Sequence, residues 1–153
     1  MSASPQSRSK TLTAWLALLL GSLGAHRFYL YGLRDARAWL YWIPTVLGLA
    51  GLTRMRNLGL DDTAASFLLP LLGLSVSMAM LAAIVTALMP DASWNLKHNA
   101  QAEPRSSGWG AVMAAVVGLF VGATILMSTL AFSGQRFFEW QTQAPASAGS
   151  PEK

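Results

Sequence analysis

Long runs of apolar residues without any charge dominate the chain. Residues 63–90 form one such window of 28 residues, and residues 106–135 form another of 30. A helix needs about 20 consecutive apolar residues to cross the hydrocarbon core of a bilayer. Both windows are apolar on every side, whereas a surface helix of a soluble domain carries a polar face. They predict transmembrane helices over about residues 63–89 and 109–133.

Two shorter apolar windows precede them, at residues 11–25 and 38–53. At 1.5 Å per residue each covers only about 23 Å of a core about 30 Å thick. The first reaches spanning length if it continues to residue 31 and the arginine in its last turns snorkels to the headgroups. The second gains length if the arginines at its two ends do the same. We therefore expect two further transmembrane helices, over about residues 11–31 and 36–53.

The pattern predicts an all-α integral membrane protein whose four transmembrane helices form two helical hairpins. The first hairpin covers residues 11–53, and the second helical pair covers residues 54–140 with a polar loop at 91–107. Residues 1–10 and 141–153 are rich in Ser, Pro, Ala and Gln. Such segments bury too little apolar surface to offset the entropy lost on ordering, so we expect two disordered tails.

The N-terminus has an alternative interpretation as a secretory signal peptide. Arg8 and Lys10 precede an Ala/Leu-rich run that ends in small residues, the pattern of a cleavable leader. Cleavage near Ala25 would remove the first helix, and the intact mass of the membrane-extracted protein distinguishes the two forms.

Composition supports the membrane assignment and excludes several functions. Hydrophobic residues make up 53% of the 153 positions and charged residues 12%, where soluble domains carry about 25% charged residues. The net charge of +4 comes from 11 basic and 7 acidic residues, so it reflects scarce charges and not the clustered basic footprint of a nucleic-acid-binding protein. The chain has no cysteine, which excludes disulfides, thiolate metal sites and a cysteine nucleophile.

The basic residues are divided almost evenly between the two sides of a four-span protein. Both tails would lie on one side, together with Arg8, Lys10, Arg54, Arg56, Arg136 and Lys153. The other side would hold Arg27, Arg34, Arg37, Lys97 and Arg105. If Arg27 is counted as embedded, the positive-inside rule favours cytoplasmic tails in a bacterial inner membrane.

Small residues recur at four-residue spacing and predict the faces on which helices pack, since small side chains allow close backbone approach in lipid. The fourth predicted helix carries Gly110, Ala114, Gly118 and Gly122, and the first carries Ala17, Gly21 and Ala25. A third stripe consists of Ser75, Ala79, Ala83 and Ala87. These faces can join helices within one chain, or join this chain to a second copy or to another membrane protein.

The most distinctive stretch comprises Gly21, Gly24, His26, Arg27, Phe28, Tyr29 and Leu30. It resembles the TM-two domain family of small membrane proteins, in which a Gly-x-x-Gly-x-(His or Asp)-Arg-Phe-Tyr-Leu-Gly pattern ends the first of two helices. Tyr31 stands in place of the last Gly of the pattern, and Gly32 follows it. The resemblance covers about residues 10–53. It implies a helical hairpin in a family without established enzymatic activity or molecular role, for which signalling and protein interaction are the suggested functions.

The motif places a histidine and a permanent cation near the membrane border, where polar groups are candidates for function. Arg27 can reach a phosphate or a carboxylate with its planar fork, and Asp35 is close enough in sequence to pair with it across the hairpin. The motif is thus a structural staple or a contact site for anionic lipid headgroups or a partner.

No catalytic or cofactor chemistry is evident. The predicted spans contain no acidic residue, and no phosphate loop, nucleophile elbow or zinc signature occurs. We expect a non-enzymatic, multi-pass inner-membrane protein without cofactor or metal, acting as a scaffold or accessory subunit through helix, lipid or partner contacts. The alternative is a small oligomeric channel or transporter. Its pore would be lined by the hydroxyls of Ser75, Ser77, Thr86, Thr124, Ser128 and Thr129, which can equally bond to their own helix backbone.

Overall fold

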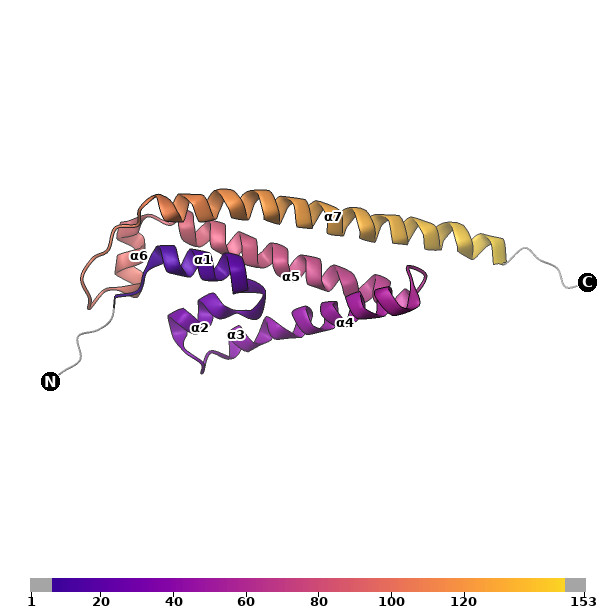
Figure 1. Cartoon of the computed structure of the whole chain (residues 1–153), viewed down its shortest axis with the longest axis horizontal. Coiled ribbons are helices and arrows are strands. Elements are labelled where there is room, and N and C mark those ends of the chain that lie inside the picture. The colour runs from indigo at the N-terminus through magenta and orange to yellow at the C-terminus, as the bar shows by residue number, and fades with distance from the viewer. Residues whose placement is uncertain (1–6, 148–153) are drawn as a thin grey trace, which may run out of the picture.

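The computed structural model describes residues 7–147, and every regular element in this range is helical (Figure 1). The elements are α1 (Lys10–Leu20), η1 (Gly21–Leu23), α2 (Ala25–Tyr31), α3 (Ala36–Leu40), α4 (Trp42–Leu58), α5 (Thr63–Leu88), α6 (Asp91–His98) and α7 (Trp109–Ser147). The predicted all-α class is confirmed over the described residues.

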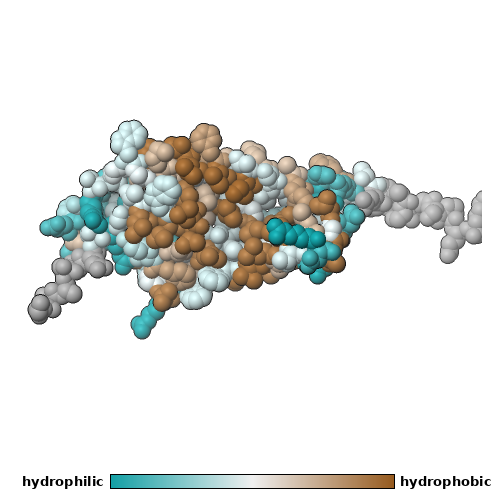
Figure 2. Space-filling view, in the orientation of Figure 1, coloured by the Kyte–Doolittle hydropathy of each residue, from teal (hydrophilic) through white to brown (hydrophobic). Residues whose placement is uncertain are grey.

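The helices α5 and α7 are long and apolar enough to cross a membrane. They lie side by side in opposite directions, with α1 and α4 packed against α5 (Figure 1). Only 22% and 28% of their most apolar windows are buried within the chain, far less than in the core helix of a soluble protein. Figure 2 shows hydrophobic residues covering the middle of the visible face and hydrophilic residues gathered towards its ends. Such an apolar band is suited to lipid.

Most small residues of the expected stripes lie where helices meet, although Ala25 lies on α2 and not on one helix with Ala17. Ala17 on α1 and Ala114 on α7 are completely buried, in one cluster with Ala83 of α5. A Cβ atom added to Gly122 would lie 2.7 Å from the Cβ of Met80. Each of these contacts joins two helices of the same chain, so these small side chains set the distance between α1, α5 and α7.

The first predicted helix, over residues 11–31, is not continuous in the structure. After α1 the chain forms one 3-10 turn and then passes through Gly24, whose φ of 74° lies in the left-handed region. This conformation strains any residue with a Cβ. The backbone therefore reverses at Gly24, and α2 runs back beside α1 (Figure 1).

Contacts between the two ends of this hairpin fix its direction. The hydroxyl of Tyr29, on α2, accepts a hydrogen bond at 3.2 Å from the backbone N–H of Ser9, which precedes α1. Arg8 donates to the carbonyl of Tyr29 at 2.6 Å. The start of α1 and the end of α2 consequently lie at the same end of the molecule, and α1 extends along only part of α5.

The second predicted helix, over residues 36–53, is divided by a turn at Tyr41 into α3 and α4, and α4 runs on to Leu58. It packs closely on α5, because a Cβ on Gly48 or Gly51 would overlap α5 backbone atoms at 2.4 to 2.9 Å. The third predicted helix agrees with α5 within one residue. Asp62 caps this helix, since its side chain accepts from the backbone N–H of Ala65 at 3.1 Å.

The last helix is longer than expected. It starts at Trp109, as predicted, but continues past residue 133 to Ser147, so residues 141–147 are helical and not part of an unstructured tail. The expected disorder at 1–6 and 148–153 lies outside the described residues. Since α1 and α2 form a hairpin at one end and α7 projects from the other (Figure 1), the two described chain ends lie at opposite ends of the bundle. The four-span prediction had placed both tails on one side.

The expected loop at 91–107 contains a helix, α6. It packs across the end of the bundle where α1 begins, and Trp94 at its centre is 2% exposed. The indole N–H of Trp94 donates to the backbone carbonyl of Arg8 at 3.0 Å. The buried Trp94 thus anchors α6 to the residues that precede α1. The polar composition of α6 gave no indication of this contact.

Candidate functional site

The glycines of the distinctive stretch form the tip of the α1–α2 hairpin, deep in the bundle. A Cβ on Gly21 would lie 2.8 Å from the Cβ of Ala79 on α5, and one on Gly24 would lie 2.6 Å from the carbonyl oxygen of Ala38 on α3. Gly24 also combines this contact with its positive φ. The tip is therefore clamped between α3 and α5 by two positions that tolerate no side chain.

His26 is the buried polar residue of the motif. Its side chain is 6% exposed, and its ring meets the ring of Tyr41 edge to face at 5.7 Å and 88°. Its Nδ1 atom is buried without a hydrogen-bond partner among the described residues. The imidazole on α2 thus packs against the turn between α3 and α4 through an aromatic contact.

Arg27 forms the ion pair expected from the sequence. Its Nε lies 2.8 Å from Oδ2 of Asp35, and its guanidinium carbon lies 5.3 Å from the centre of the Tyr31 ring. Desolvation raises the pKa of Asp35, but hydrogen bonds from Arg27 and from the backbone of Arg37, together with their charges, bring it below the ordinary value. The carboxylate is thus held ionised where α2 turns into α3.

The remaining motif residues are partly buried against other segments of the chain. Phe28 meets Trp39 of α3 edge to face at 5.4 Å, and Tyr29 holds the chain start through the two hydrogen bonds described above. Leu30 and Ala25 are half-buried. The four consecutive motif side chains at positions 26 to 29 therefore all touch other parts of the same chain.

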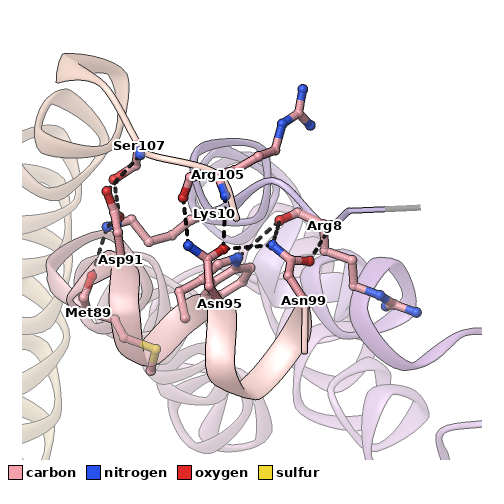
Figure 3. Close-up of polar contacts among 9 residues, drawn as sticks. Arg8, Lys10, Met89, Asp91, Asn95, Asn99, Arg105 and Ser107 are labelled. Carbon is pink, nitrogen blue, oxygen red and sulfur yellow. Dashed lines mark hydrogen bonds and ion pairs between the residues drawn. The ribbon is translucent and has the colours of Figure 1, made fainter. Parts of the chain in front are cut away.

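A polar cap joins the chain start to α6 at the end where α1 begins (Figure 3). Lys10, only 8% exposed, lies 2.6 Å from Oδ1 of Asp91 and donates to the carbonyl of Met89 at 2.7 Å. Ser107 donates to Asp91 from both its backbone N–H and its hydroxyl, at 2.8 and 2.5 Å. The hydrogen bond from Lys10, the two from Ser107 and the charge of Lys10 lower the pKa of Asp91 to about 2 despite partial burial.

Two asparagines complete the cap (Figure 3). The Asn99 side chain accepts from the backbone N–H of Arg8 at 2.7 Å and donates to its carbonyl at 3.1 Å. The Asn95 side chain likewise accepts from the backbone N–H of Arg105 at 3.2 Å and donates to its carbonyl at 2.9 Å. This network was not predicted from the sequence. The signal that could have revealed it is the spacing of Asn95 and Asn99, which follow Trp94 and lie one helical turn apart, so that both amides face the same side of a helix.

The six hydroxyls considered as a pore lining do not come together in one chain. Ser77, Thr124 and Thr129 each donate to the carbonyl four residues earlier in their own helix. Ser75 instead lies 2.7 Å from the hydroxyl of Thr45 and joins α5 to α4. Thr124, Ser128 and Thr129 border an apolar pocket of about 440 Å³ between α5 and α7. Thr86 is half-buried.

Over residues 7–147 no cluster of three or more His, Asp or Glu side chains is arranged to hold a metal ion. The ion pairs of this region are those of Lys10 with Asp91, Arg27 with Asp35, Arg54 with Asp62 and Arg136 with Glu139. The first three pairs join neighbouring helices or the turns beside them, and the pair of Arg136 with Glu139 lies within α7.

Comparison with known protein families agrees with the resemblance seen in the motif. The family model of the TM2 domain matches residues 6–55, a region that contains the α1–α2 hairpin, α3 and most of α4. No curated protein and no solved structure matches the chain. The TM2 domain and the two long apolar helices make this a membrane protein, and the match ends before α5, α6 and α7.

Proposed function

We propose that this membrane protein is a non-enzymatic scaffold or accessory subunit that acts by contact with a partner or with lipid at its TM2 domain. The proposal rests on the contacts that the motif side chains make within the chain. Arg27 is paired with Asp35, and Tyr29 bonds the chain start, so these groups build a rigid turn and leave the apolar exterior available for contacts.

The membrane arrangement that fits this proposal has three crossings and a re-entrant hairpin. Helices α3 and α4 together contain residues 36–58, which at 1.5 Å per residue extend about 34 Å, enough for a core about 30 Å thick. Helices α5 and α7 supply the other two crossings. The α1–α2 hairpin enters and leaves from one side, an arrangement tolerated where protein covers the broken backbone, as α3 and α5 do at the tip.

This arrangement changes the charge balance between the two sides. The side where α1 begins holds Arg8, Lys10, Arg27, Arg34, Arg37, Lys97 and Arg105. The side to which α4 runs holds Arg54 and Arg136, which contact Asp62 and the carbonyl of Leu60 respectively, and also Arg56. The excess of basic residues on the side where α1 begins favours a cytoplasmic location for that side in a bacterial inner membrane. The end of α7 would then lie on the opposite side.

The proposal is tested by affinity purification of the full chain from its native membranes in a mild detergent. We expect a membrane-protein partner to be recovered in stoichiometric amount, or a homo-oligomer of fixed size. Leu33 projects from the turn after α2 and is 74% exposed, and Leu96 on α6 is 78% exposed. If contact is made at the TM2 domain, Leu33→Ser lowers partner recovery and Leu96→Ser, its matched control, does not.

The same preparation distinguishes the channel alternative. Ion flux into liposomes that contain the purified chain alone would contradict a scaffold role and favour an oligomeric pore. Recovery of a partner without such flux supports the proposal. Equal loss of partner in the Leu33 and Leu96 variants would place the contact outside the TM2 domain.

A further inference from the structure

An apolar groove with two arginines at one end runs between α3–α4 and α5. Its volume is about 600 Å³. Leu40 and Ile43 form one wall, Leu71 and Leu74 on α5 form the other, and Met78 also borders it. Arg27 and Arg37 lie at its edge. The groove thus combines an apolar channel with a cationic entrance, which is the complement of an anionic amphiphile.

The entrance carries more positive than negative charge. The pair with Asp35 engages Nε of Arg27, and Arg37 adds a second cation. Among the described residues the Arg37 side chain has no ion pair or hydrogen bond, since its contact with Asp35 uses the backbone N–H. Two guanidinium groups against one carboxylate leave an excess of one positive charge, and the planar forks are suited to a phosphate group.

We propose that this groove binds one anionic glycerophospholipid, with its phosphate at Arg27 and Arg37 and an acyl chain between α4 and α5. The inference rests on the proposed membrane role and names the lipid contact of the TM2 domain. The apolar walls accept any acyl chain, so the arginines provide the selection for negative charge. The groove opens on the side that carries most of the basic residues, where anionic lipids concentrate positive protein segments.

Other occupants fit the groove less well. A soluble phosphate would satisfy the arginines but gain nothing from the leucine walls. A peptide would bring backbone N–H and C=O groups against apolar side chains, and unsatisfied polar groups in such surroundings cost several kcal/mol each. A zwitterionic lipid would place a third cation, that of its own headgroup, beside the two arginines. An anionic lipid satisfies both parts of the site.

The test measures lipid retained by the full chain, purified in detergent and observed by native mass spectrometry during stepwise delipidation. Equal amounts of phosphatidylglycerol and phosphatidylcholine are added, and inorganic phosphate is tested separately. We expect one phosphatidylglycerol to persist after phosphatidylcholine is lost. Arg37→Gln should weaken its retention about tenfold, the effect of one charge-assisted contact. Arg34→Gln alters another exposed arginine, one that does not border the groove, and should leave retention unchanged.

A second pair of variants tests the acyl part of the site without changing charge. Met78→Trp fills the groove, and Met127→Trp places the same side chain on the exposed surface of α7. The two methionines are 57% and 67% exposed, so neither substitution overfills a core. Phosphatidylglycerol retention should fall about tenfold in the first variant and stay at the wild-type level in the second.

The outcomes separate this inference from the scaffold proposal. Equal retention of the two lipids, or equal effects of the Arg34 and Arg37 variants, would overturn the lipid site while partner recovery remained intact. Competition by inorganic phosphate alone would assign the arginines to a soluble anion. Displacement of the lipid by the purified partner protein would assign the groove to that protein. If the full chain retains phosphatidylglycerol as expected but no partner or homo-oligomer is recovered with it, only the scaffold proposal is contradicted.

Discussion

The Nε atom of Arg27 lies 2.8 Å from Oδ2 of Asp35 and joins the end of the hairpin to the start of α3. Asp35 has a second task, because its other oxygen accepts from the backbone N–H of Arg37 at 3.1 Å and caps α3. One carboxylate therefore fixes both the turn and the direction in which the following helix leaves it.

The two tasks of Asp35 can be separated by substitution. Asp35→Asn keeps a side-chain oxygen for the cap but loses the ion pair, whereas Asp35→Ala loses both. We expect the thermal unfolding temperature in detergent to fall in the order wild type, Asn variant, Ala variant. Equal temperatures for the two variants would show that the cap contributes nothing.

Gly24 and Gly32 provide a matched test of the hairpin tip. Both have a positive φ, 74° and 80°, but an added Cβ meets Ala38 at the first and nothing within 4 Å at the second. Gly32→Ala should cost about 2 kcal/mol of unfolding free energy from backbone strain, because the φ of 80° and ψ of 177° lie in a region that is essentially restricted to glycine. Gly24→Ala adds a steric overlap and should cost about 3 kcal/mol or more. Chemical unfolding in mixed micelles measures both, and similar losses would contradict the clamped tip.

Close packing of α7 on α5 predicts a position-dependent effect of glycine substitution. Gly122→Leu inserts a side chain against Met80 and should destabilise the bundle by about 1–3 kcal/mol. Gly134, on the same helix, has nothing within 4 Å of an added Cβ, so Gly134→Leu should change stability by less than about 0.5 kcal/mol. Gly118→Leu should behave like Gly122→Leu, since its Cβ would lie 3.2 Å from Ile84. Resistance to extraction at rising temperature reports the difference.

The sequence predicted those elements whose signals are local and strong. The two uncharged windows located α5 and the start of α7, and the spacing of Arg27 and Asp35 predicted their pairing. In each case a charge or an apolar run decides the outcome before any distant contact is made.

The missed features depend on contacts between distant segments. The apolar run passes unbroken through Gly21 and Gly24, so only its shortness hinted that it does not span. The fold of α6 depends on burial of Trp94 by a chain start 86 residues away. The end of α7 was polar enough to resemble a tail, but Arg136 and Glu139 pair one turn apart on the helix and support its continuation.

The re-entrant hairpin makes a direct topological prediction, and the chain's lack of cysteine permits single-cysteine labelling without a background. With three crossings, Ser7→Cys and Ser106→Cys lie on one side, and Leu60→Cys and Thr142→Cys on the other. A membrane-impermeant maleimide applied to spheroplasts should label the second pair, and the first only after permeabilisation. Labelling of Ser7 and Thr142 from the same side would restore the four-span arrangement.

The polar cap predicts acid sensitivity near the start of α1. The pKa of Asp91 is lowered from 3.8 to about 2, so its ionised form stabilises the folded state fully above the unfolded value. This contribution is lost as pH falls from about 4 through about 2. Asp91→Asn should be less stable than wild type at pH 7 and should approach it at pH 2. Melting curves at pH 7, 5, 3 and 2 provide the comparison, and a constant difference would exclude this linkage.

The burial of α1 also sets an order of assembly in time. Ala14 and Ala17 leave the ribosome early, but the surfaces that cover them belong to α5 and α7 and include Ala83 and Ala114. Helix α1 therefore cannot reach its final surroundings until α7, nearly a hundred residues later in the chain, has been synthesised and inserted. The α1–α5–α7 core of this bundle is therefore completed only after synthesis of α7, however early α1 itself becomes helical.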